Sequence, residues 1–309
     1  MTSSPPIAAN VLARAISRLK TARPPLRAAR LAPYTTFAIG GPAEFLIMPI
    51  SEKEAIEVLD IIAGEGIPWR ILGGGSDLLV SDGGVSGAVV RMGAPFDGFR
   101  FEGNTLIAAA GAKLPALAWA AAERGLSGLE FAVGIPGTAG GATSANAGSR
   151  GRDMAGIIRK VGVYRPGEGA REYASGECGF VYRGSRFVTA SEAVLEIVCE
   201  LHPADPAAVK ERMREIREER KRKYPLEWPS AGSVFKNPPG DSAGRLLEAA
   251  GLKGEERGGA RISEKHANWI VNRGKARSDD VESLIRLARE KVRERFGVEL
   301  KQEIIMWGD

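Results

Sequence analysis

Hydrophobic and polar positions divide the chain into short helical and extended segments. After Ser51, the apolar residues Ile56, Leu59 and Ile62 recur every three positions, which is typical of one face of a helix. Ser51 and Glu54 have the spacing of a capping box at the start of that helix. The same reasoning predicts further helices over residues 114–124, 206–223, 245–250 and 279–295.

Extended segments rich in β-branched and aromatic residues alternate with these helices. They predict strands over residues 34–37, 43–50, 68–72, 85–92, 105–109, 160–164, 194–201, 268–272 and 298–307. We expect the last of these strands to pair with an earlier sheet. Residues 134–148 carry too many glycines for either element and are expected to form a loop. Helices and strands mixed in this way predict an α+β fold.

The chain is basic, and its charge is unevenly distributed. It has 309 residues, with 43 Lys and Arg against 38 Asp and Glu, which gives a net charge of +5. Six of the basic residues and no acidic residue lie in residues 1–30, so the rest of the chain sums to −1. We therefore expect residues 1–33 to be a loosely ordered basic extension, and we expect no nucleic-acid partner. An organelle transit peptide stays open as an alternative.

Composition excludes several other classes of protein. Apolar residues make up 44% and charged residues 26%, which is typical of a globular protein of two or three domains. The longest uncharged run, residues 131–149, contains five glycines and is no membrane span. Cys178 and Cys199 are too few for a disulfide framework and fit a reducing compartment. His202 and His266 lack the spacing of metal ligands, so no metal is expected.

Two glycine-rich segments, residues 73–80 and 134–148, follow predicted strands. Without side chains, backbone N–H groups can converge on an anion such as a phosphate. The first segment is neither a GxGxxG fingerprint nor a P-loop, which disfavours a Rossmann site and a nucleotide hydrolase. Tight turns alone would explain one such segment, whereas two in one chain favour a dinucleotide pyrophosphate.

Three polar residues outside these segments allow a functional and a structural interpretation. Arg183 in an apolar setting could hold a substrate carboxylate or extend from a strand edge. Ser233 could donate a proton, polarised by Lys236, or be an ordinary turn serine. Glu303 in an apolar strand could be a poised acid or base, or an edge charge that prevents aggregation.

Taken in order, these stretches resemble one known family. The chain is similar to the UDP-N-acetylenolpyruvoylglucosamine reductases from about Tyr34 to Gly308. The segments that carry the resemblance are Tyr34-Thr35-Thr36-Phe37 with Ile39-Gly40-Gly41-Pro42-Ala43, Gly73-Gly74-Gly75-Ser76-Asp77-Leu78-Leu79, Gly134-Ile135-Pro136-Gly137 with Asn146-Ala147-Gly148, Tyr182-Arg183-Gly184-Ser185, Pro229-Ser230-Ala231-Gly232-Ser233-Val234-Phe235-Lys236-Asn237-Pro238, Ser263-Glu264-Lys265-His266-Ala267-Asn268 and Leu300-Lys301-Gln302-Glu303.

The resemblance implies a domain organisation. It implies an FAD-binding fold of two subdomains, of the vanillyl-alcohol-oxidase type, with a C-terminal α+β substrate domain. The implied boundaries are 34–93, joined by the final strand 298–309, for the first FAD subdomain, 94–204 for the second, and 205–297 for the substrate domain. The third unit lacks an inserted loop with a tyrosine, which resembles the shorter subclass of the family.

The resemblance also implies a reaction: reduction of UDP-N-acetylglucosamine enolpyruvate to UDP-N-acetylmuramate in peptidoglycan precursor synthesis, with FAD as cofactor and NADPH as reductant. Flavin N5 would deliver hydride to the vinyl carbon, Arg183 and Glu303 would stabilise the enolate, and Ser233 would protonate the adjacent carbon. The implied cofactor-binding residues are Gly73, Gly74, Gly75, Ser76, Asp77, Leu78, Gly134, Ile135, Pro136, Gly137, Gly140, Gly141, Asn146, Ala147 and Gly148. The implied substrate-binding residues are Tyr182, Lys236, Asn237, His266 and Asn268. A cytoplasmic monomer without membrane insertion is expected.

Two departures and two rival interpretations accompany the resemblance. Asp77 stands where Asn is common in the family, and Gln302 replaces a common Pro before Glu303. One rival is another FAD-linked oxidoreductase of the same fold that oxidises an alcohol or hydroxy acid. It needs a basic group and no serine acid, so the run around Ser233 argues against it. The other rival is a non-enzymatic binding module that uses the basic extension.

Overall fold

Helices and short strands alternate along residues 14–15, 17–94, 96–188 and 192–308, which the computed structural model describes. The α-helices are α2 (Glu52–Gly64), α3 (Leu114–Glu123), α4 (Ala139–Ser144), α5 (Pro206–Lys223), α6 (Ala243–Ala249) and α7 (Ser278–Phe296). The strands are β1 (Leu26–Arg30), β2 (Pro42–Ile47), β3 (Trp69–Leu72), β4 (Leu78–Val80), β5 (Val85–Arg91), β6 (Phe99–Glu102), β7 (Thr105–Ala109), β8 (Leu126–Ser127), β9 (Gly148–Ser149), β10 (Arg152–Asp153), β11 (Ile158–Arg165), β12 (Gly169–Ala174), β13 (Ala193–Glu200), β14 (His202–Pro203), β15 (Glu256–Arg257), β16 (Ala260–Ile262), β17 (Ile270–Asn272) and β18 (Ile305–Trp307).

The chain divides into two compact units, each built from separated stretches of sequence. Unit 1 comprises the residues up to Arg27 together with Glu44–Gly74 and Ser86–Glu218. Unit 2 comprises Ala28–Ala43, Gly75–Val85 and the residues from Glu219 onward. The predicted boundaries at residues 33, 93, 204 and 297 describe a finer division, which stays a prediction.

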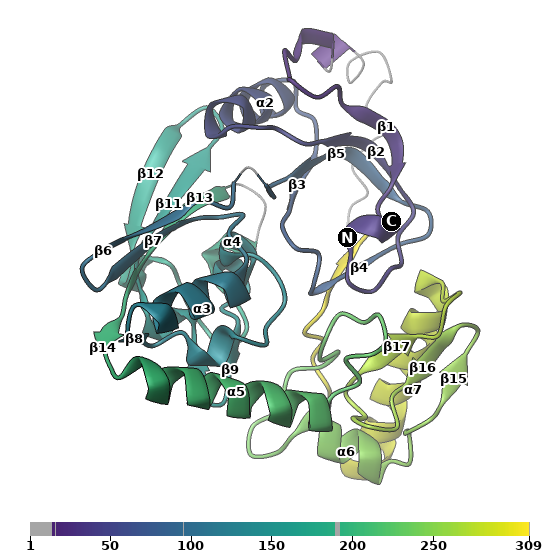
Figure 1. The fold of residues 1–309 in the computed structure, drawn as a ribbon. Coiled ribbons are helices and arrows are strands. Elements are labelled where there is room, and N and C mark those ends of the chain that lie inside the picture. The colour runs from purple at the N-terminus through teal and green to yellow at the C-terminus, as the bar shows by residue number, and fades with distance from the viewer. Residues whose placement is uncertain (1–13, 16, 95, 189–191, 309) are drawn as a thin grey trace. The chain divides into compact units, whose positions relative to one another are not determined.

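Unit 1 contains a five-stranded antiparallel sheet with the order β12-β11-β13-β7-β6. Helices α3 and α4 and the first part of α5 cover one face of this sheet (Figure 1). Ala118 and Ala121 of α3 are fully buried, and their small side chains let the helix lie close to the strands. The predicted helix over 114–124 is confirmed, and it ends before Gly125, which has a left-handed φ of +68°.

A second core of unit 1 lies between α2 and strands β2, β3 and β5. Leu59 and Ile62 of α2 are buried in this core and Ile56 is half-buried against it, so the predicted apolar face is confirmed, and Val58 is buried as well. Ser51 Oγ accepts a hydrogen bond from the N–H of Glu54 at 3.1 Å and caps the helix as expected. The strands belong to a four-stranded sheet with the order β1-β2-β5-β3, in which β3 and β5 are parallel.

Unit 2 is built on α6, α7 and the antiparallel sheet β15-β16-β17, whose apolar side chains form one core. Strand β18 pairs in parallel with β4, with Ile305 opposite Leu78. The pairing of the last strand with an earlier one is therefore confirmed, although the strand comprises only Ile305–Trp307 of the range 298–307 that the sequence predicts. The turn after β4 is tied to the start of α7, because Asp82 Oδ2 accepts hydrogen bonds from the N–H and hydroxyl of Ser278 at 2.9 and 3.1 Å.

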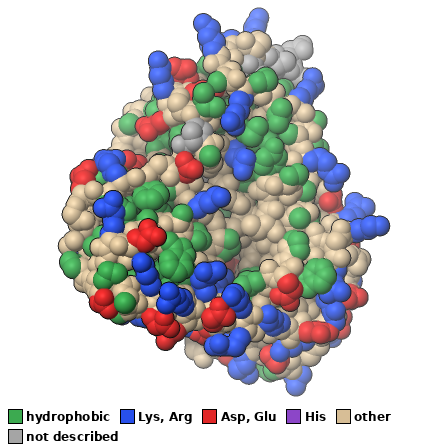
Figure 2. Space-filling view, in the orientation of Figure 1, with side chains coloured by type: hydrophobic (Ala, Val, Ile, Leu, Met, Phe, Trp, Pro, Cys, Tyr) green, Lys and Arg blue, Asp and Glu red, His purple; other side chains and the backbone are tan. Residues whose placement is uncertain are grey.

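Most of the surface of the charged helix α5 faces solvent, as expected from its sequence. The buried residues of α5 are Val209, Met213 and Ile216, which lie in one narrow stripe along the helix. Charged residues cover the rest, with ion pairs such as Lys223 to Glu219 at 2.5 Å. In the lower part of Figure 2, where α5 lies in Figure 1, Lys and Arg side chains alternate with Asp and Glu.

Three expectations about local structure are wrong. Residues 34–37 do not form a strand, because a 3-10 turn at Ala32–Tyr34 precedes an irregular segment there. The loop expected over 134–148 contains helix α4, which Thr138 caps by accepting from the N–H of Gly141 at 3.4 Å. In the extension, residues 26–30 form β1, so loose order is the wrong expectation for that part. Residues 1–13 and 16 of the extension lie outside the described residues.

Candidate active site

The two glycine-rich segments lie against each other within unit 1. A Cβ atom added to Gly73 would lie 2.6 Å from Oγ1 of Thr138, and one added to Gly74 would lie 2.7 Å from Cα of Gly137. Real Cβ contacts are not this short, so a side chain at position 74 would require the backbone to move, and one at position 73 would require the Thr138 side chain to move. The structure therefore brings together two segments that the sequence marks separately.

The first segment continues into unit 2 through Gly75, which has a left-handed φ of +59°. A Cβ at this position would lie 2.2 Å from the carbonyl oxygen of Tyr34, and the N–H of Thr36 donates to the Gly75 carbonyl at 3.0 Å. Ser76 and Asp77 follow, and the Asp77 carbonyl accepts from the N–H of Ile305 at 3.0 Å. The segment 34–37 thus packs on the glycine turn instead of forming a strand.

Helix α4, which lies in the second segment, contains two glycines, one closely packed and one exposed. The N–H of Gly140 donates to the carbonyl of Ala110 at 2.8 Å, and a Cβ on Gly140 would lie 2.8 Å from the Cβ of Ala110. Gly141 is exposed, and a Cβ there would meet only Oγ1 of Thr138 at 3.5 Å. Thr138 is a residue that the sequence-based site prediction missed, although a threonine before small residues is a common N-cap signal.

Asn146 is buried, and its side chain bonds to protein groups on three sides. Its Nδ2 donates to the carbonyl of Val181 at 3.0 Å and to Oδ2 of Asp153 at 3.2 Å. Its Oδ1 accepts from the N–H of Ala155 at 3.0 Å. Gly148 begins the hairpin β9-β10, where a Cβ would lie 2.3 Å from the carbonyl oxygen of Arg152. These contacts connect the predicted cofactor segment to the segment that carries Arg183.

Arg183 lies in a two-residue turn of unit 1. Val181 and Gly184 exchange backbone hydrogen bonds of 3.0 and 3.2 Å on either side of it. Arg183 has a left-handed φ of +54°, which costs a non-glycine residue about 1–2 kcal/mol. Strained residues of this kind cluster at functional sites. Its guanidinium donates to the carbonyl of Gly148 at 2.7 Å and lies 5.1 Å from the ring of the half-exposed Tyr182.

Ser233 and Glu303 lie on neighbouring segments of unit 2. The N–H of Glu303 donates to the carbonyl of Val234, the residue after Ser233, at 2.8 Å. Phe235 forms an antiparallel bridge with Gln302, which fixes the register of the two segments. Both Ser233 and Glu303 are half-buried, and the Ser233 hydroxyl has no hydrogen-bond partner among the described residues. A hydroxyl without a protein partner can act on a bound ligand.

The predicted substrate-binding residues of unit 2 differ in their surroundings. The half-buried Lys236 continues the segment after Ser233, and its N–H donates to the carbonyl of Lys301 at 2.8 Å. Asn237 is exposed, and its Oδ1 accepts from the N–H of Ala243 at the start of α6. Asn268 is buried, and its side chain bonds to the backbone of Phe235.

His266 is a neutral, packed imidazole. Its Nδ1 accepts from the N–H of Asn268 at 3.2 Å, and its ring centroid lies 5.1 Å from that of Tyr224. Burial lowers the pKa of His266 below its ordinary value of 6.5, and the nearby charge of Lys253 lowers it further. At neutral pH this side chain therefore acts as a hydrogen-bond acceptor rather than as a cation.

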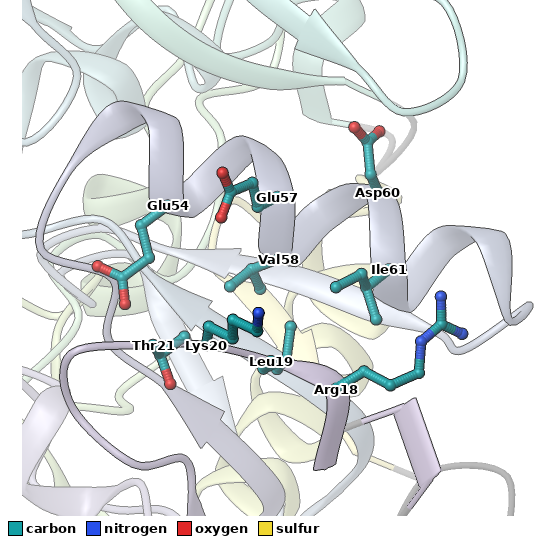
Figure 3. Close-up of a pocket in the computed structure, with 9 residues that line it drawn as sticks. All are labelled: Arg18, Leu19, Lys20, Thr21, Glu54, Glu57, Val58, Asp60 and Ile61. Atoms are coloured by element: carbon teal, nitrogen blue, oxygen red, sulfur yellow. The ribbon is translucent and has the colours of Figure 1, made fainter.

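A hollow of about 310 Å³ in unit 1 lies between the chain before β1 and helix α2, and none of the predicted site residues lines it. Its lining residues are Arg18, Leu19, Lys20, Thr21, Glu54, Glu57, Val58, Asp60 and Ile61 (Figure 3). Glu54 holds the two segments together, because its Oε1 accepts from the N–H of Ala22 and its Oε2 from the N–H of Ile50. Through these contacts, the part of the extension that precedes β1 packs against α2.

The described residues contain neither a metal-binding cluster nor a membrane-spanning helix. No group of three or more His, Cys, Asp or Glu side chains in that part of the chain is placed to hold a metal ion. Within the same residues, no helix combines the length and the apolar character that crossing a membrane requires.

Comparison with known proteins places most of the chain in one family. The UDP-N-acetylenolpyruvoylglucosamine reductase C-terminal domain matches residues 224–307, and an FAD binding domain matches residues 43–164. The UDP-N-acetylenolpyruvoylglucosamine reductase 2 of Symbiobacterium thermophilum is 47% identical over 91% of this chain and 92% of its own length. The reductase of Rubrobacter xylanophilus is 44% identical over 89% of this chain and 93% of its own length.

A solved structure agrees with these matches. The crystal structure of the UDP-N-acetylenolpyruvylglucosamine reductase of Thermus caldophilus has a TM-score of 0.79 and 38% sequence identity, and the match covers 91% of this chain and 98% of that one. The predicted α+β fold with an FAD-binding domain is confirmed by these findings. The chain therefore belongs to the UDP-N-acetylenolpyruvoylglucosamine reductase family.

Proposed function

We propose that this chain reduces UDP-N-acetylglucosamine enolpyruvate to UDP-N-acetylmuramate, with FAD as cofactor and NADPH as reductant. Relatives that carry the reductase name match nine-tenths of the chain, which supports the substrate. The single observation that carries the proposal is the pairing of the segment after Ser233 with Glu303, through the 2.8 Å bond from the Glu303 N–H to the Val234 carbonyl. We further propose that the enzyme is a cytoplasmic monomer.

The glycine segments fit a dinucleotide cofactor. Gly73 and Gly74 meet Thr138 and Gly137 at distances that leave no space for side chains, while Gly141 is exposed. Backbone N–H groups on such segments can surround a pyrophosphate without competing side chains. We assign FAD binding to residues 73–78, 134–137, 140–141 and 146–148. Asn146 would act there by fixing the position of the neighbouring backbone, because its side chain already forms hydrogen bonds with the backbone of Val181 and Ala155.

FAD, when bound, supplies the hydride that is added to the vinyl carbon of the substrate. The residues of the chain must then stabilise the negative charge that develops on the substrate. We assign Arg183 to the substrate carboxylate and to the enolate, because a guanidinium stabilises such charge through paired hydrogen bonds. The strained turn holds Arg183 in advance of binding, which lowers the cost of ordering this side chain.

We assign Ser233 as the donor of the proton that the adjacent carbon accepts. Its hydroxyl has no partner among the described residues, so it is available to a ligand. Lys236 lies three positions further along and carries a positive charge that would stabilise the resulting alkoxide. We assign Glu303 to the enolate, where a carboxyl group donates a hydrogen bond in its protonated form.

The remaining substrate contacts are assigned to Tyr182, Lys236, Asn237 and His266. Tyr182 offers a half-exposed ring beside Arg183. Neutral His266 offers Nε2 as the remaining polar atom of its ring, because its Nδ1 is used by Asn268.

The absorbance spectrum of the purified protein tests the proposal. We expect a yellow protein whose flavin bands bleach on anaerobic addition of NADPH and recover on addition of the enolpyruvyl nucleotide sugar. Bleaching of the oxidised flavin by NADPH but not by an alcohol or hydroxy acid, followed by recovery with that sugar, separates this function from FAD-linked oxidoreductases that oxidise an alcohol or hydroxy acid. A colourless protein that cannot be loaded with FAD would contradict it.

A further inference from the structure

Asn268 bonds to two consecutive residues of the segment that follows Ser233. Its side chain is 4% exposed, and its Oδ1 accepts from the N–H of Phe235 at 2.9 Å. Its Nδ2 donates to the carbonyl of Phe235 at 2.8 Å, and its own carbonyl accepts from the N–H of Val234 at 2.9 Å. The primary amide therefore takes the place of a neighbouring strand, because it offers the same donor and acceptor as a peptide group.

The opposite edge of the same segment pairs with the residues around Glu303. The N–H of Glu303 donates to the carbonyl of Val234, and the N–H of Lys236 donates to the carbonyl of Lys301, both at 2.8 Å. Residues 234–236 thus lie between Asn268 on one side and residues 301–303 on the other. Every backbone N–H of this short segment is bonded, so its position is strongly determined.

The chain before Ser233 is held at a greater distance along the sequence, where the N–H of Ser230 donates to the carbonyl of Thr36 at 3.1 Å and the Ser230 carbonyl accepts from Oγ1 of Thr36 at 2.7 Å. Gly232 has a left-handed φ of +77°, and no atom lies within 4 Å of the position that its Cβ would occupy. The hydroxyl of Ser233 itself bonds to no described residue. The bonded residues 234–236 directly follow Ser233, whereas Ser230 lies three positions before it, so the residues that follow restrain the position of Ser233 more directly.

We propose that Asn268 is a positioning residue for the reaction: it sets the location of the Ser233 hydroxyl relative to Glu303 through the backbone of residues 234–236. This inference rests on the proposed function of Ser233 as proton donor. It replaces the sequence-based expectation that Asn268 binds the substrate. A residue that acts through Ser233 affects proton donation to the substrate, whereas reduction of the flavin by NADPH does not use that proton.

Asn272 provides a matched control in the same unit. It is 5% exposed, and its side chain also bonds only to backbone groups: Nδ2 donates to the carbonyl of Phe37 at 3.1 Å, and Oδ1 accepts from the N–H groups of Gly274 and Ala276. None of these groups belongs to residues 234–236. Substitution of Asn272 should therefore cost folding stability without moving Ser233.

The experiment compares Asn268→Asp and Asn272→Asp in the FAD-loaded protein by stopped-flow absorbance. Aspartate keeps the size and one acceptor of asparagine and loses the Nδ2 donor. We expect Asn268→Asp to slow flavin reoxidation by the enolpyruvyl substrate about tenfold or more, and to leave reduction by NADPH within about twofold. Asn272→Asp is expected to leave both rates within about twofold. If the buried charge prevents Asn268→Asp from folding, Asn268→Ala and Asn272→Ala serve for the same comparison.

A double-mutant cycle with Ser233→Ala separates positioning from general damage. If Asn268 acts through Ser233, its substitution slows reoxidation by a smaller factor in the Ser233→Ala protein than in the parent. An equal factor in both backgrounds, or equal slowing of both half-reactions, would overturn the inference while leaving the role of Ser233 intact. If Ser233→Ala alone leaves reoxidation unchanged, the proton-donor assignment fails, and this inference fails with it.

Discussion

Arg183 donates through Nη2 to the carbonyl oxygen of Gly148 at 2.7 Å, so a backbone group of the hairpin β9-β10 holds the guanidinium. Alanine at position 148 would bring its Cβ to 2.3 Å from the carbonyl oxygen of Arg152. The backbone must move, and the acceptor of Arg183 must move with it. We expect Gly148→Ala to lower kcat/KM for the enolpyruvyl substrate about ten- to a hundredfold in steady-state assays.

Gly176 supplies the control for that substitution, since no atom lies within 4 Å of its Cβ position. Gly176→Ala should keep kcat/KM within about twofold of the parent enzyme. An unchanged kcat/KM in Gly148→Ala would mean that the carbonyl of Gly148 does not determine the position of Arg183.

The contact between the glycine segments predicts a loss of cofactor. Gly74→Ala would place a Cβ at 2.7 Å from Cα of Gly137 and push the two segments apart. We expect the purified variant to retain less than about a tenth of the FAD of the parent, measured from the flavin absorbance per protein, because pyrophosphate binding needs both segments. Gly98→Ala has open space around its Cβ and should keep its flavin. Full flavin content in Gly74→Ala would argue against binding between these segments.

The hydroxyl of Ser233 is expected to matter in only one half of the reaction. Ser233→Ala removes the proposed proton donor while the backbone bonds of Val234 and Phe235 remain. We expect flavin reduction by NADPH to stay within about twofold and reoxidation by the substrate to slow by about a hundredfold or more. Rapid-mixing absorbance measures both rates. Equal slowing of both would indicate that Ser233 has a structural role.

The neutral imidazole of His266 makes folding stability depend on pH. Burial lowers the pKa of folded His266 below 6.5, so below pH 6.5 the unfolded chain binds a proton that the folded chain resists. The stability that this residue contributes is present above pH 6.5 and is lost as the pH falls through the folded pKa. We expect the fall in Tm between pH 7.5 and pH 5 to be smaller in His266→Gln than in the parent. His202→Gln, at an exposed position, should show the fall of the parent, and an equal fall in all three proteins would contradict the assignment.

Glu54 should contribute to stability far more than its exposed neighbour Glu57. Its carboxylate accepts the backbone N–H groups of Ala22 and Ile50 at 2.8 and 2.7 Å, whereas Glu57 makes only an exposed pair of 4.0 Å with Lys53. Hydrogen bonds to a charged acceptor contribute about 1.5–3 kcal/mol. We expect Glu54→Ala to lower the free energy of unfolding by about 2 kcal/mol and Glu57→Ala by less than about 0.5 kcal/mol in urea titrations. Similar losses in the two variants would show that the carboxylate does not hold the segment before β1.

Local patterns in the sequence were sufficient to predict most helices and many strands. The cap at Ser51, the Asp205-Pro206 start of α5 and the glycine after α7 all act within a few residues, so they are visible without tertiary structure. Helix α4 was missed because Gly140 and Gly141 have poor helix propensity. Its formation depends on the cap at Thr138 and on the close packing of Gly140 on Ala110, which only the folded chain provides.

The candidate site was predictable as a set of residues and not as an arrangement. The sequence marked both glycine segments, but their contact joins Gly74 to Gly137, and no local pattern reports such a distant pairing. The family resemblance implied that Asn268 binds the substrate. In the structure its side-chain amide bonds to the backbone of Phe235, a contact 33 residues away in sequence that no local pattern reports.

The parallel pairing of β18 with β4 has a consequence for the synthesis of the protein. Strand β4 ends at Val80 and its partner begins at Ile305, so the ribosome makes more than two hundred residues between the two. Unit 2 likewise joins Ala28–Ala43 and Gly75–Val85 to the residues from Glu219 onward. During translation, β4 has no strand partner until β18 has been made, so its edge is open to incorrect pairing. Unit 2 can therefore complete the pairing of β4 with β18 only after residues 305–307 have been synthesised.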